Sequence, residues 1–514
     1  MSLNVRNRSL KLEDLNVAAG SRHLLGPLKI AIHPGECVGL VGESGSGKSL
    51  TALSMLGLLP KGLKATGRLL LGDHNIELMS EAHAALRGSF LAWIPQDPLS
   101  SLHPMRTVGS QLLEILSQHR GSRDKRLAIE LFERVQLPDP ARALRKYPHE
   151  FSGGQRQRVS IAMALASAPK LLIADEPTSA LDARIARDIL DLLDTLRRED
   201  DLGLMLISHD LPLVGAYAQQ VLVLQKGDLV EFGPSAQLFS SPQHAYTREL
   251  IAADHLPAAA RPSSEAPIVL KGNDIEVRYR NAPRPALNGV HLELHRGEGL
   301  ALVGESGSGK STLGRALMRL LKTSKGSVTF EGVDLLTLDE ASLRSQRSKF
   351  GIVFQDPYAS LNPRMKIRDI IGEPLRVHGM DADLEERVGT LIEDVGLTRD
   401  MLDRYPHQFS GGQRQRIAIA RALATDPQVL ICDEAVSALD AHYRAAILEL
   451  LAKLKQSRGV SLLFITHDLV AAAAVAERIA VLENGTIVER GLTEDVLRQP
   501  QHAHTKALLD ARPS

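Results

Sequence analysis

The sequence is poor in cysteine and has no long apolar runs. Its only two cysteines, Cys37 and Cys432, exclude a disulfide framework and a four-cysteine metal site, and this scarcity is typical of a protein that stays in a reducing compartment. The most apolar stretch, Leu469 to Ala476, falls short of the roughly 18 residues that a membrane-spanning helix needs. The opening residues, MSLNVRNRSLKLED, lack the apolar segment of a signal peptide. Any role at a membrane is therefore expected to depend on partner subunits.

The sequence also lacks an excess of charge of either sign. Lysine and arginine number 61, aspartate and glutamate also number 61, and the formal net charge is zero. Nucleic-acid-binding domains usually carry a basic excess, so this balance argues against nucleic acid as a partner. With 44% hydrophobic residues the chain can form large cores. Its length of 514 residues allows about two to five domains.

Two sequence motifs occur twice, in the same order. GESGSGKS occupies Gly42–Ser49 and recurs at Gly304–Ser311, 262 residues later. FSGGQRQR occupies Phe151–Arg158 and recurs at Phe409–Arg416, 258 residues later. This period is much longer than the repeat of a solenoid. Each copy is therefore predicted to be a domain.

The composition between the copies predicts where one domain ends. Residues 256–267, LPAAARPSSEAP, are rich in proline, alanine and serine, as in a semi-rigid linker. The predicted domains are therefore 1–255 and 268–514. In each half, short apolar segments such as KLLIADE and GLMLISHD alternate with helical patterns, which is typical of an α/β fold with a parallel sheet. Apolar residues at helical spacing predict helical subdomains at about 97–150 and 356–408.

GESGSGKS fits the pattern GxxxxGK[ST] of phosphate-binding P-loops. Glycines in such a loop let backbone N–H groups surround phosphates, and the following helix presents its N-terminus. Lys48 and Lys310 are expected to reach the β- and γ-phosphates of ATP, and Ser49 and Ser311 to bind Mg²⁺. The other expected nucleotide contacts are Gly42, Ser44, Gly45, Gly47 and Thr51 in the first half, and Gly304, Ser306, Gly307, Gly309 and Thr312 in the second.

An apolar run that ends in Asp-Glu follows each P-loop. LLIADE ends at Glu176 and VLICDE ends at Glu434. Asp175 and Asp433 are expected to hold Mg²⁺ through water. The two glutamates are expected to orient or deprotonate the water that attacks ATP.

FSGGQ resembles the signature motif of ABC (ATP-binding-cassette) ATPases, and the resemblance covers both halves nearly from end to end. It implies two tandem nucleotide-binding domains, each with a P-loop core sheet, helices and a helical subdomain. It also implies that Gln96 and Gln355 are the Q-loop glutamines, which serve catalysis and the Mg²⁺ site. His209 and His467 match the switch histidines that contact the γ-phosphate.

The resemblance further implies that the two domains face each other head to tail, with each ATP between the P-loop of one half and the signature of the other. Hydrolysis then requires closure, since both halves supply donors to the γ-phosphate. The residues expected to cap ATP on Lys48 are Ser410, Gly411, Gly412 and Gln413. Those expected to cap ATP on Lys310 are Ser152, Gly153, Gly154 and Gln155. SALD at Ser179–Asp182 and Ser437–Asp440 matches the D-loop, and Asp182 and Asp440 are the nucleotide-site candidates in it.

The halves differ where the family contacts the base and the α-phosphate. Tyr279 fits the aromatic residue that stacks on adenine, whereas the matching residue in the first half is Ala19, with His23 as a possible substitute. The residue after the Mg²⁺-binding serine is Thr312 in the second half but Leu50 in the first. The second half is therefore expected to bind ATP more tightly. The catalytic residues are present in both halves.

Two further segments resemble the ATPase subunits of dipeptide and oligopeptide importers, a group that includes nickel and glutathione importers. QDPLSSLHP at Gln96–Pro104 recurs as QDPYASLNP at Gln355–Pro363. PQHAYTREL at Pro242–Leu250 recurs as PQHAHTKAL at Pro500–Leu508. Many members of this group carry a cysteine-rich tail that binds an iron–sulfur cluster. This sequence lacks those cysteines, so no cluster is expected.

The resemblance implies a chain that hydrolyses ATP, with Mg²⁺, to energise import of di- or oligopeptides or related small solutes. It implies two membrane permease subunits as partners. Their docking segments are expected at Leu99–Pro104 and Tyr358–Pro363, and because these differ in sequence the permeases are expected to be non-identical. A periplasmic or lipid-anchored solute-binding protein would complete the system. The chain would lie at the cytoplasmic face of the bacterial inner membrane as a peripheral subunit.

Two other functions remain open from the sequence. The first is a soluble twin-ABC protein that acts on ribosomes or nucleic acid. Ribosome-associated members usually have a long charged helical arm between the domains, and DNA-repair members carry zinc-binding cysteines, and this sequence shows neither feature. The second is a fused ATPase for another solute such as a sugar, although the second half of such proteins usually has degraded motifs.

Overall fold

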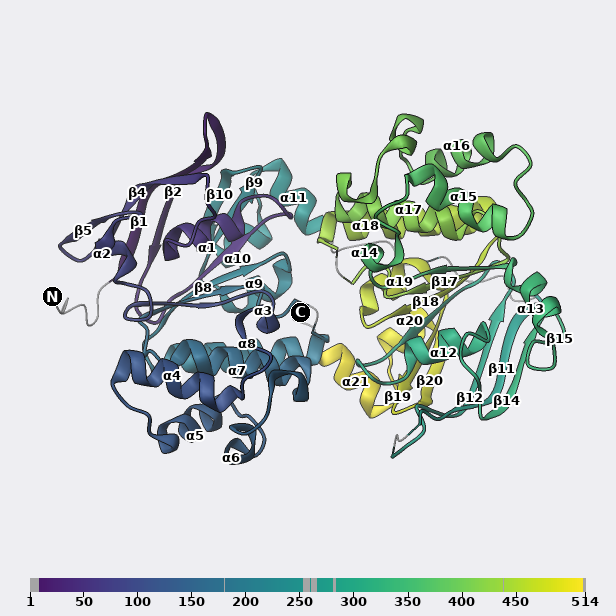
Figure 1. The fold of residues 1–514 in the computed structure, drawn as a ribbon, viewed down its shortest axis with the longest axis horizontal. Helices are drawn as coiled ribbons and strands as arrows, with labels where there is room; N and C mark the ends of the chain where they lie inside the picture. Colours follow the sequence, from purple (N-terminus) through teal and green to yellow (C-terminus); the bar gives the residue numbers. More distant parts are fainter. Residues whose placement is uncertain are drawn as a thin grey trace. The chain divides into compact units, whose positions relative to one another are not determined.

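The computed structural model describes residues 9–179, 181–252, 259, 266–280, 283–437 and 439–511. The described residues fall into two compact units, the first ending at Ala252 and the second ending at Ala511 (Figure 1). The linker predicted at 256–267 lies outside the described residues, apart from Ala259, Ala266 and Pro267.

The elements of the first unit follow an alternating order of strands and helices. Its strands are β1 Leu10–Ala19, β2 Arg22–Ile32, β3 Cys37–Val41, β4 Leu63–Leu71, β5 His74–Glu77, β6 Leu91–Ile94, β7 Leu171–Asp175, β8 Gly203–Ser208, β9 Gln220–Gln225 and β10 Asp228–Pro234. Its helices are α1 Lys48–Leu56, α2 Glu81–Ala84, α3 Pro98–Ser101, α4 Val108–Arg120, α5 Lys125–Arg134, α6 Pro140–Ala143, the 3₁₀ helix η1 Pro148–Glu150, α7 Gly153–Leu165, α8 Ala183–Glu199, α9 Leu211–Tyr217, α10 Ser235–Ser240 and α11 Ala245–Ala252.

The second unit repeats this order. Its strands are β11 Ile268–Val277, β12 Leu287–His295, β13 Gly299–Val303, β14 Lys325–Phe330, β15 Val333–Asp334, β16 Phe350–Val353, β17 Val429–Asp433, β18 Ser461–Thr466, β19 Arg478–Glu483 and β20 Thr486–Leu492. Its helices are α12 Lys310–Leu317, α13 Glu340–Arg347, α14 Pro357–Ser360, α15 Ile367–Val377, α16 Leu384–Asp394, the 3₁₀ helices η2 Arg399–Asp403 and η3 Pro406–Gln408, α17 Gly411–Ala422, α18 Ala441–Arg458, α19 Leu469–Val475, α20 Thr493–Arg498 and α21 Ala503–Asp510.

Each unit contains one mostly parallel sheet and one antiparallel sheet. In the first unit the strand orders are β10-β9-β3-β8-β7-β6 and β2-β1-β4-β5. In the second unit they are β16-β17-β18-β13-β19-β20 and β12-β11-β14-β15. Within the larger sheets only β10 and β20 run antiparallel to their neighbours. The predicted fold class, two tandem α/β domains with a P-loop core sheet, is therefore confirmed.

A helical segment lies between the strand that precedes the Q-loop and the signature helix in each unit. In the first unit it contains α3 to α6 and η1, and Figure 1 shows α4 and α5 beside α7. Polar side chains begin these helices, because the first N–H groups of a helix need an acceptor. The Thr107 hydroxyl accepts from the N–H of Ser110, and the Asp124 carboxylate accepts from the N–H of Arg126.

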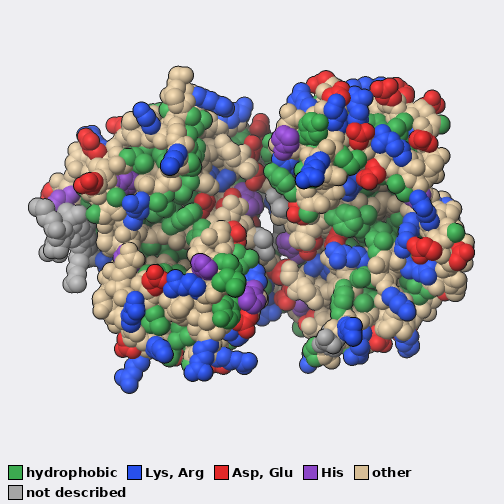
Figure 2. Space-filling model, viewed as in Figure 1, with side chains coloured by type: hydrophobic (Ala, Val, Ile, Leu, Met, Phe, Trp, Pro, Cys, Tyr) green, Lys and Arg blue, Asp and Glu red, His purple; other side chains and the backbone are tan. Residues whose placement is uncertain are grey.

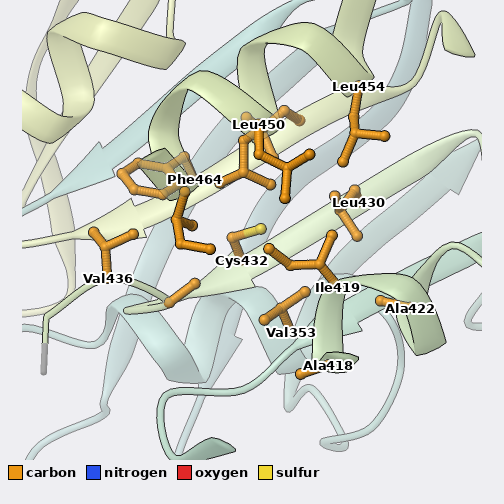
Figure 3. Packing of buried hydrophobic residues seen from close by; sticks show 14 of the residues in the cluster. Val353, Ala418, Ile419, Ala422, Leu430, Cys432, Val436, Leu450, Leu454 and Phe464 are labelled. Carbon is orange, nitrogen blue, oxygen red and sulfur yellow. The ribbon is translucent and has the colours of Figure 1, made fainter. Parts of the chain in front are cut away.

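The parallel sheets are buried on both faces, which explains their near-continuous apolar sequences. In the second unit one face packs against α17, α18 and the helical segment, and the other against α12 and the antiparallel sheet. Figure 3 shows Cys432 on β17 between Phe464, Leu450 and Ile419, as one more apolar side chain of the core. Cys37 is equally buried in β3. Burial raises the pKa of Cys37 to about 12 and also raises that of Cys432, so both thiols stay protonated and unreactive.

The surface of both units carries charges of both signs. Figure 2 shows lysine and arginine side chains interspersed with aspartate and glutamate on the face in view. Within the described residues, no helix is long and apolar enough to cross a membrane.

Replacing Phe464 by alanine should destabilise the second unit, because the ring is fully buried and alanine would leave a cavity. We expect the free energy of unfolding of that unit to fall by about 3–5 kcal/mol. Val333→Ala, at a side chain that is 39% exposed, is the matched control and should change stability by less than about 0.5 kcal/mol. Denaturant unfolding of the full chain measures both, and equal effects from the two substitutions would contradict the packing.

Candidate active sites

The loop between β3 and α1 wraps back on itself and is closed by backbone contacts. Gly42, with φ 151°, lies so close to the chain that an added Cβ would be 2.3 Å from the carbonyl oxygen of Leu224. Gly304 repeats this in the second unit, where an added Cβ would be 2.2 Å from the oxygen of Leu482. Only glycine can hold these positions. The loop therefore takes the same shape in both units.

The lysine that begins the next helix points back into the loop. Lys48 is 5% exposed, and its Nζ donates to the carbonyl oxygens of Gly42 at 2.7 Å and Glu43 at 3.0 Å. Lys310 donates to the equivalent oxygens at 2.7 and 2.9 Å. Both ammonium groups therefore lie beside the N-terminus of α1 or α12, where N–H groups and the helix dipole favour an anion.

The serine after each lysine meets the last aspartate of a neighbouring strand. Ser49 Oγ lies 3.5 Å from Asp175 Oδ1, and Ser311 Oγ donates to Asp433 Oδ1 at 2.7 Å. Burial raises the pKa of both aspartates, and the serine hydroxyl opposes that rise. No group of three or more His, Cys, Asp or Glu side chains in the described part of the chain could hold a metal. One hydroxyl and one carboxylate, completed by phosphate oxygens and water, fit the way Mg²⁺ binds beside nucleotides.

The glutamate after each aspartate is held by an amide and an imidazole. Gln96 Nε2 donates to Glu176 Oε2 at 2.8 Å, and His209 Nδ1 lies 3.3 Å from Glu176 Oε1. Two of the predicted catalytic residues therefore converge on the carboxylate of a third. The further expectation that Gln96 serves the Mg²⁺ site would involve its amide oxygen, and it stays a prediction.

The second unit repeats the cluster with a longer distance between histidine and glutamate. Gln355 Nε2 donates to Glu434 Oε2 at 2.8 Å, and His467 Nδ1 lies 3.9 Å from Glu434 Oε1. Lys310 Nζ is also 3.9 Å from the same oxygen. The glutamate is therefore close enough to the P-loop lysine to act on a group bound there.

The backbone of both glutamates is in the left-handed region, with φ 47° at Glu176 and φ 50° at Glu434. This conformation is uncommon for residues other than glycine and costs energy that the surroundings must offset. The N–H of Glu176 donates to the oxygen of Ile207 at 2.8 Å, and the N–H of Glu434 to that of Ile465 at 2.9 Å. These bonds fix the turn after each strand and aim the carboxylates.

Opposing effects set the pKa of the two glutamates. Burial alone would raise the pKa of Glu176, but the neighbouring imidazole of His209, together with the charge of Lys48, outweighs burial and lowers it. The same balance, with His467 and Lys310, lowers the pKa of Glu434. Both carboxylates therefore stay ionised and able to accept a proton from water.

The residues of FSGGQ begin a long helix in each unit. Ser152 Oγ accepts from the N–H of Gln155, and Gln155 Oε1 accepts from the N–H of Ser152. Ser410 and Gln413 form the same capping box. In both units the serine and the first glycine, Gly153 or Gly411, are exposed, whereas Gly154 and Gly412 are buried against α8 and α18. The exposed helix N-terminus is suited to an anion, and its role across the halves remains a proposal.

Asp182 and Asp440 precede α8 and α18, and Asp182 is 6% exposed. The D-loop residues Ala180 and Ala438, which each lie two residues before these aspartates, are outside the described residues. The other predicted loop residues, Ser44, Gly45, Ser306 and Gly307, are exposed at the tips of the two P-loops.

The segments that the sequence predicts to contact the base differ in structure between the units. Tyr279 is 45% exposed, and its hydroxyl lies 3.2 Å from Thr312 Oγ1, beside the start of α12. Ala19 instead pairs with Arg22 in a tight hairpin. His23 Nε2 lies 3.8 Å from Asp228 Oδ1. The unequal affinities expected for ATP remain a prediction.

One residue predicted to contact the nucleotide lies in the core of the first unit. Thr51 is fully buried, and its hydroxyl donates to the oxygen of Gly47 at 3.1 Å. Its counterpart in α12 is Leu313, also fully buried. Thr51 therefore belongs to the core beneath α1, and the sequence pattern around the P-loop could not separate this face of the helix from the phosphate side.

Sequence reasoning missed a turn that supports each P-loop. The N–H of Gly227 donates to the oxygen of Ser46 at 3.0 Å, and the N–H of Gly485 donates to that of Ser308 at 2.9 Å. Both glycines have positive φ in the hairpins β9–β10 and β19–β20. The recurring glycine in QKGDLV and ENGTIV was the available signal.

Comparison with known proteins places the chain in a family. The family model described as ABC transporter matches residues 25–179 and 287–437, and that described as oligopeptide/dipeptide transporter, C-terminal region, matches 230–273. The chain is 43% identical to the peptidoglycan transport ATP-binding protein YejF of Agrobacterium fabrum, over 98% of this chain and 96% of that protein. It is 42% identical to the glutathione import ATP-binding protein GsiA of Escherichia coli, over 98% of this chain and 89% of that protein. The chain belongs to the ABC transporter family.

Solved structures of single cassettes match parts of the chain. A dimeric ATP-binding cassette in a post-hydrolysis state, bound to ADP and Pi, is 31% identical, with a TM-score of 0.41 and coverage of 44% of this chain and 98% of that one. The cbiO1 protein of Clostridium perfringens is 27% identical, with a TM-score of 0.42 and coverage of 46% and 92%. As a member of the family the chain is an ATPase and binds ATP, and its two copies of the catalytic cluster are the places where hydrolysis is expected.

Replacing His209 and His467 by alanine should move the acid limb of the ATPase pH profile to higher pH. The imidazoles lower the pKa of the two glutamates, so without them burial dominates and the pKa rises. Activity that needs the ionised carboxylate is then lost at a higher pH as the solution is acidified. The measurement is kcat/KM for ATP across the acidic range. His149→Ala, at an exposed histidine, is the control, and an unshifted limb in the double variant would contradict the role of the imidazoles.

Proposed function

We propose that this chain is the ATP-hydrolysing subunit of an importer for dipeptides, oligopeptides or related small solutes such as glutathione. The observation that carries the proposal is the pair of complete catalytic clusters around Glu176 and Glu434 in a chain similar over nearly its full length to importer ATPases. The match of residues 230–273 to an oligopeptide/dipeptide transporter region supports the solute class. The formal net charge of zero supports the expectation that nucleic acid is not a partner.

In this proposal each P-loop binds the phosphates of ATP through its backbone N–H groups and through Lys48 or Lys310. Ser49 with Asp175, and Ser311 with Asp433, would hold Mg²⁺, which would supply positive charge beside the phosphates. Glu176 or Glu434 orients the attacking water and accepts its proton. Phosphoryl transfer needs little covalent help from the protein, so positioning and charge account for most of the rate.

The glutamine and histidine on each glutamate position it and report on the γ-phosphate. Gln96 and Gln355 each follow a strand, β6 or β16, and lead directly into the helical segment. A change at the γ-phosphate can therefore pass along the chain to that segment. We further propose that Ser410–Gln413 cap ATP on Lys48 and that Ser152–Gln155 cap ATP on Lys310, with the D-loop aspartates beside them.

The partners in this proposal are two non-identical permeases, served by a solute-binding protein, with the chain at the cytoplasmic face of the bacterial inner membrane. The segments after the Q-loop glutamines expose apolar side chains, with Leu99 44% and Tyr358 65% exposed. In the second unit a cleft opens beside this segment, between β16, α15 and the end of α17, and Gln355 and Arg421 line it. Arg421 also donates to the carbonyl oxygen of Ser360 and so fixes the end of the segment after Gln355.

Two further features distinguish the docking surfaces of the two units. The Tyr358 ring stacks on the Arg414 guanidinium at 3.6 Å, directly next to the signature residue Gln413. In the first unit, Leu99 cannot form this stack. Met163 in α7 lies at the position that matches Arg421 in α17. Different surfaces suit different permeases, which supports a heteromeric membrane partner.

Combining Glu176→Gln with Glu434→Gln should abolish ATP turnover while ATP still binds, because the substitutions remove the proton acceptors and leave the P-loops intact. The expected loss is at least about a hundredfold. Uptake of labelled dipeptides and glutathione by cells that carry the variant should stop as well. Substantial hydrolysis by the double variant would refute the catalytic assignment, and normal uptake would refute the importer function.

Replacing both Leu99 and Tyr358 by aspartate should separate ATP hydrolysis from transport. The basal ATPase of the isolated chain should stay near normal, because neither side chain contacts the catalytic clusters. Copurification of the permeases and uptake should be lost, since a charge would be buried at each contact. Phe232→Asp, at a side chain that is 60% exposed on β10, is the control. Intact complexes with normal uptake in the double variant would show that the permeases dock elsewhere.

A further inference from the structure

The segment PQHAYT, which the catalytic cluster leaves unexplained, packs against the P-loop in the first unit. Tyr246, at the start of α11, is only 4% exposed. Its hydroxyl oxygen accepts a hydrogen bond from the backbone N–H of Glu43, at 3.0 Å and across 203 residues of sequence. Glu43 is the second residue of GESGSGKS. The C-terminal segment of the unit therefore contacts the phosphate loop directly.

The segment that carries Tyr246 is itself fixed to the sheet. The Glu231 carboxylate on β10 accepts from the N–H of Gln243 at 2.8 Å and from the N–H of His244 at 3.0 Å. His244 Nδ1 in turn accepts from the N–H of Tyr246 at 3.2 Å. These hydrogen bonds hold the segment around Tyr246 in place, so the tyrosine ring has little freedom to move away from the P-loop.

The contact completes the support of one peptide group in the loop. In the peptide group that joins Gly42 to Glu43, the carbonyl oxygen of Gly42 accepts from Lys48 Nζ at 2.7 Å. The N–H of the same group, on Glu43, donates to the Tyr246 hydroxyl. A loop that binds phosphates through its backbone depends on the orientation of such peptide groups.

The second unit has a histidine where the first has the tyrosine. His504 lies at the matching position of α21, and its side chain is 8% exposed. Its Nδ1 lies 3.4 Å from Glu483 Oε1, while its Nε2 is buried and has no hydrogen-bond partner among the described residues. The other supports of the P-loop, from Lys310 and Gly485, are the same as in the first unit. The tyrosine contact is therefore a feature that distinguishes the first unit.

We infer that Tyr246 is a positioning residue for the phosphate site of the first half, where its hydroxyl holds the P-loop in the shape that binds ATP. This inference rests on the proposed function of that loop. The first half lacks counterparts of Tyr279 and Thr312 of the second half. The shape of the P-loop therefore contributes a larger part of the ATP affinity in the first half.

The test is Tyr246→Phe in the full chain, with Lys310→Ala added so that ATP binds only to the first half. Loss of one hydrogen bond should weaken binding of ATP by about two- to tenfold. In the chain without Lys310→Ala, KM for ATP should rise while kcat stays near normal, because Glu176, Gln96 and His209 are untouched. Tyr217→Phe, which removes a tyrosine hydroxyl bonded to Asp191 at 2.7 Å outside the loop, is the control for general stability.

The matching position of the second half gives a second comparison. His504→Phe, tested with Lys48→Ala so that ATP binds only to the second half, should leave ATP affinity unchanged. Equal weakening by His504→Phe and Tyr246→Phe would overturn the inference, because it would assign the effect to packing. Unchanged affinity in Tyr246→Phe would also overturn it, as would a drop in the thermal unfolding midpoint well beyond that of Tyr217→Phe. If Lys48→Ala fails to abolish ATP binding at the first half, the proposed function of the P-loop itself is wrong.

Discussion

The parallel register of β3, β8 and β7 is the constraint on which each catalytic site depends. Val41 pairs with Ser208, and Asp175 pairs with Ile207, so three strands end at the same edge of the sheet. The P-loop follows the first strand, His209 follows the second and Glu176 follows the third. A shift of one residue would turn the side chains to the opposite face. Packing on both faces of the sheet fixes the register, and so the core determines the distances in the site.

This dependence explains which parts of the site were predictable from the sequence. The P-loop, the Asp-Glu pair and the switch histidine each follow a short apolar strand, and the carboxyl ends of parallel strands meet at one edge. Their sequence positions therefore imply their proximity. Gln96 was identified instead from the resemblance to ABC ATPases, and it lies just after β6 of the same sheet. The strand–loop–helix order was predictable because its residues are local in sequence.

Other parts depend on contacts that the sequence pattern does not record. Tyr246 meets Glu43 across 203 residues, and no periodicity links a C-terminal helix to a loop near the start of the chain. Thr51 looks like a second hydroxyl near the phosphates, but the turn of α1 carries it to the buried side. The left-handed backbone of Glu176 and Glu434 was also hidden, because glutamate gives no local signal for positive φ. In each case tertiary packing overrides what the neighbouring residues suggest.

The two units share the glutamine–glutamate contact and the backbone conformation of the glutamate, and they differ in several contacts around them. The amide–glutamate distance is 2.8 Å in both units, and both glutamates have nearly the same φ. Differences occur at the base contact, at the residue beside the P-loop and at the segment after the Q-loop. A hydrolytic centre tolerates little displacement, since small errors in position cost large factors in rate. Contacts with the base and with partners alter affinity without entering the reaction. If both halves must bind ATP before they close, the half with the lower affinity for ATP sets the ATP concentration at which closure occurs. The half with the higher affinity then sets how long the nucleotide stays bound between cycles.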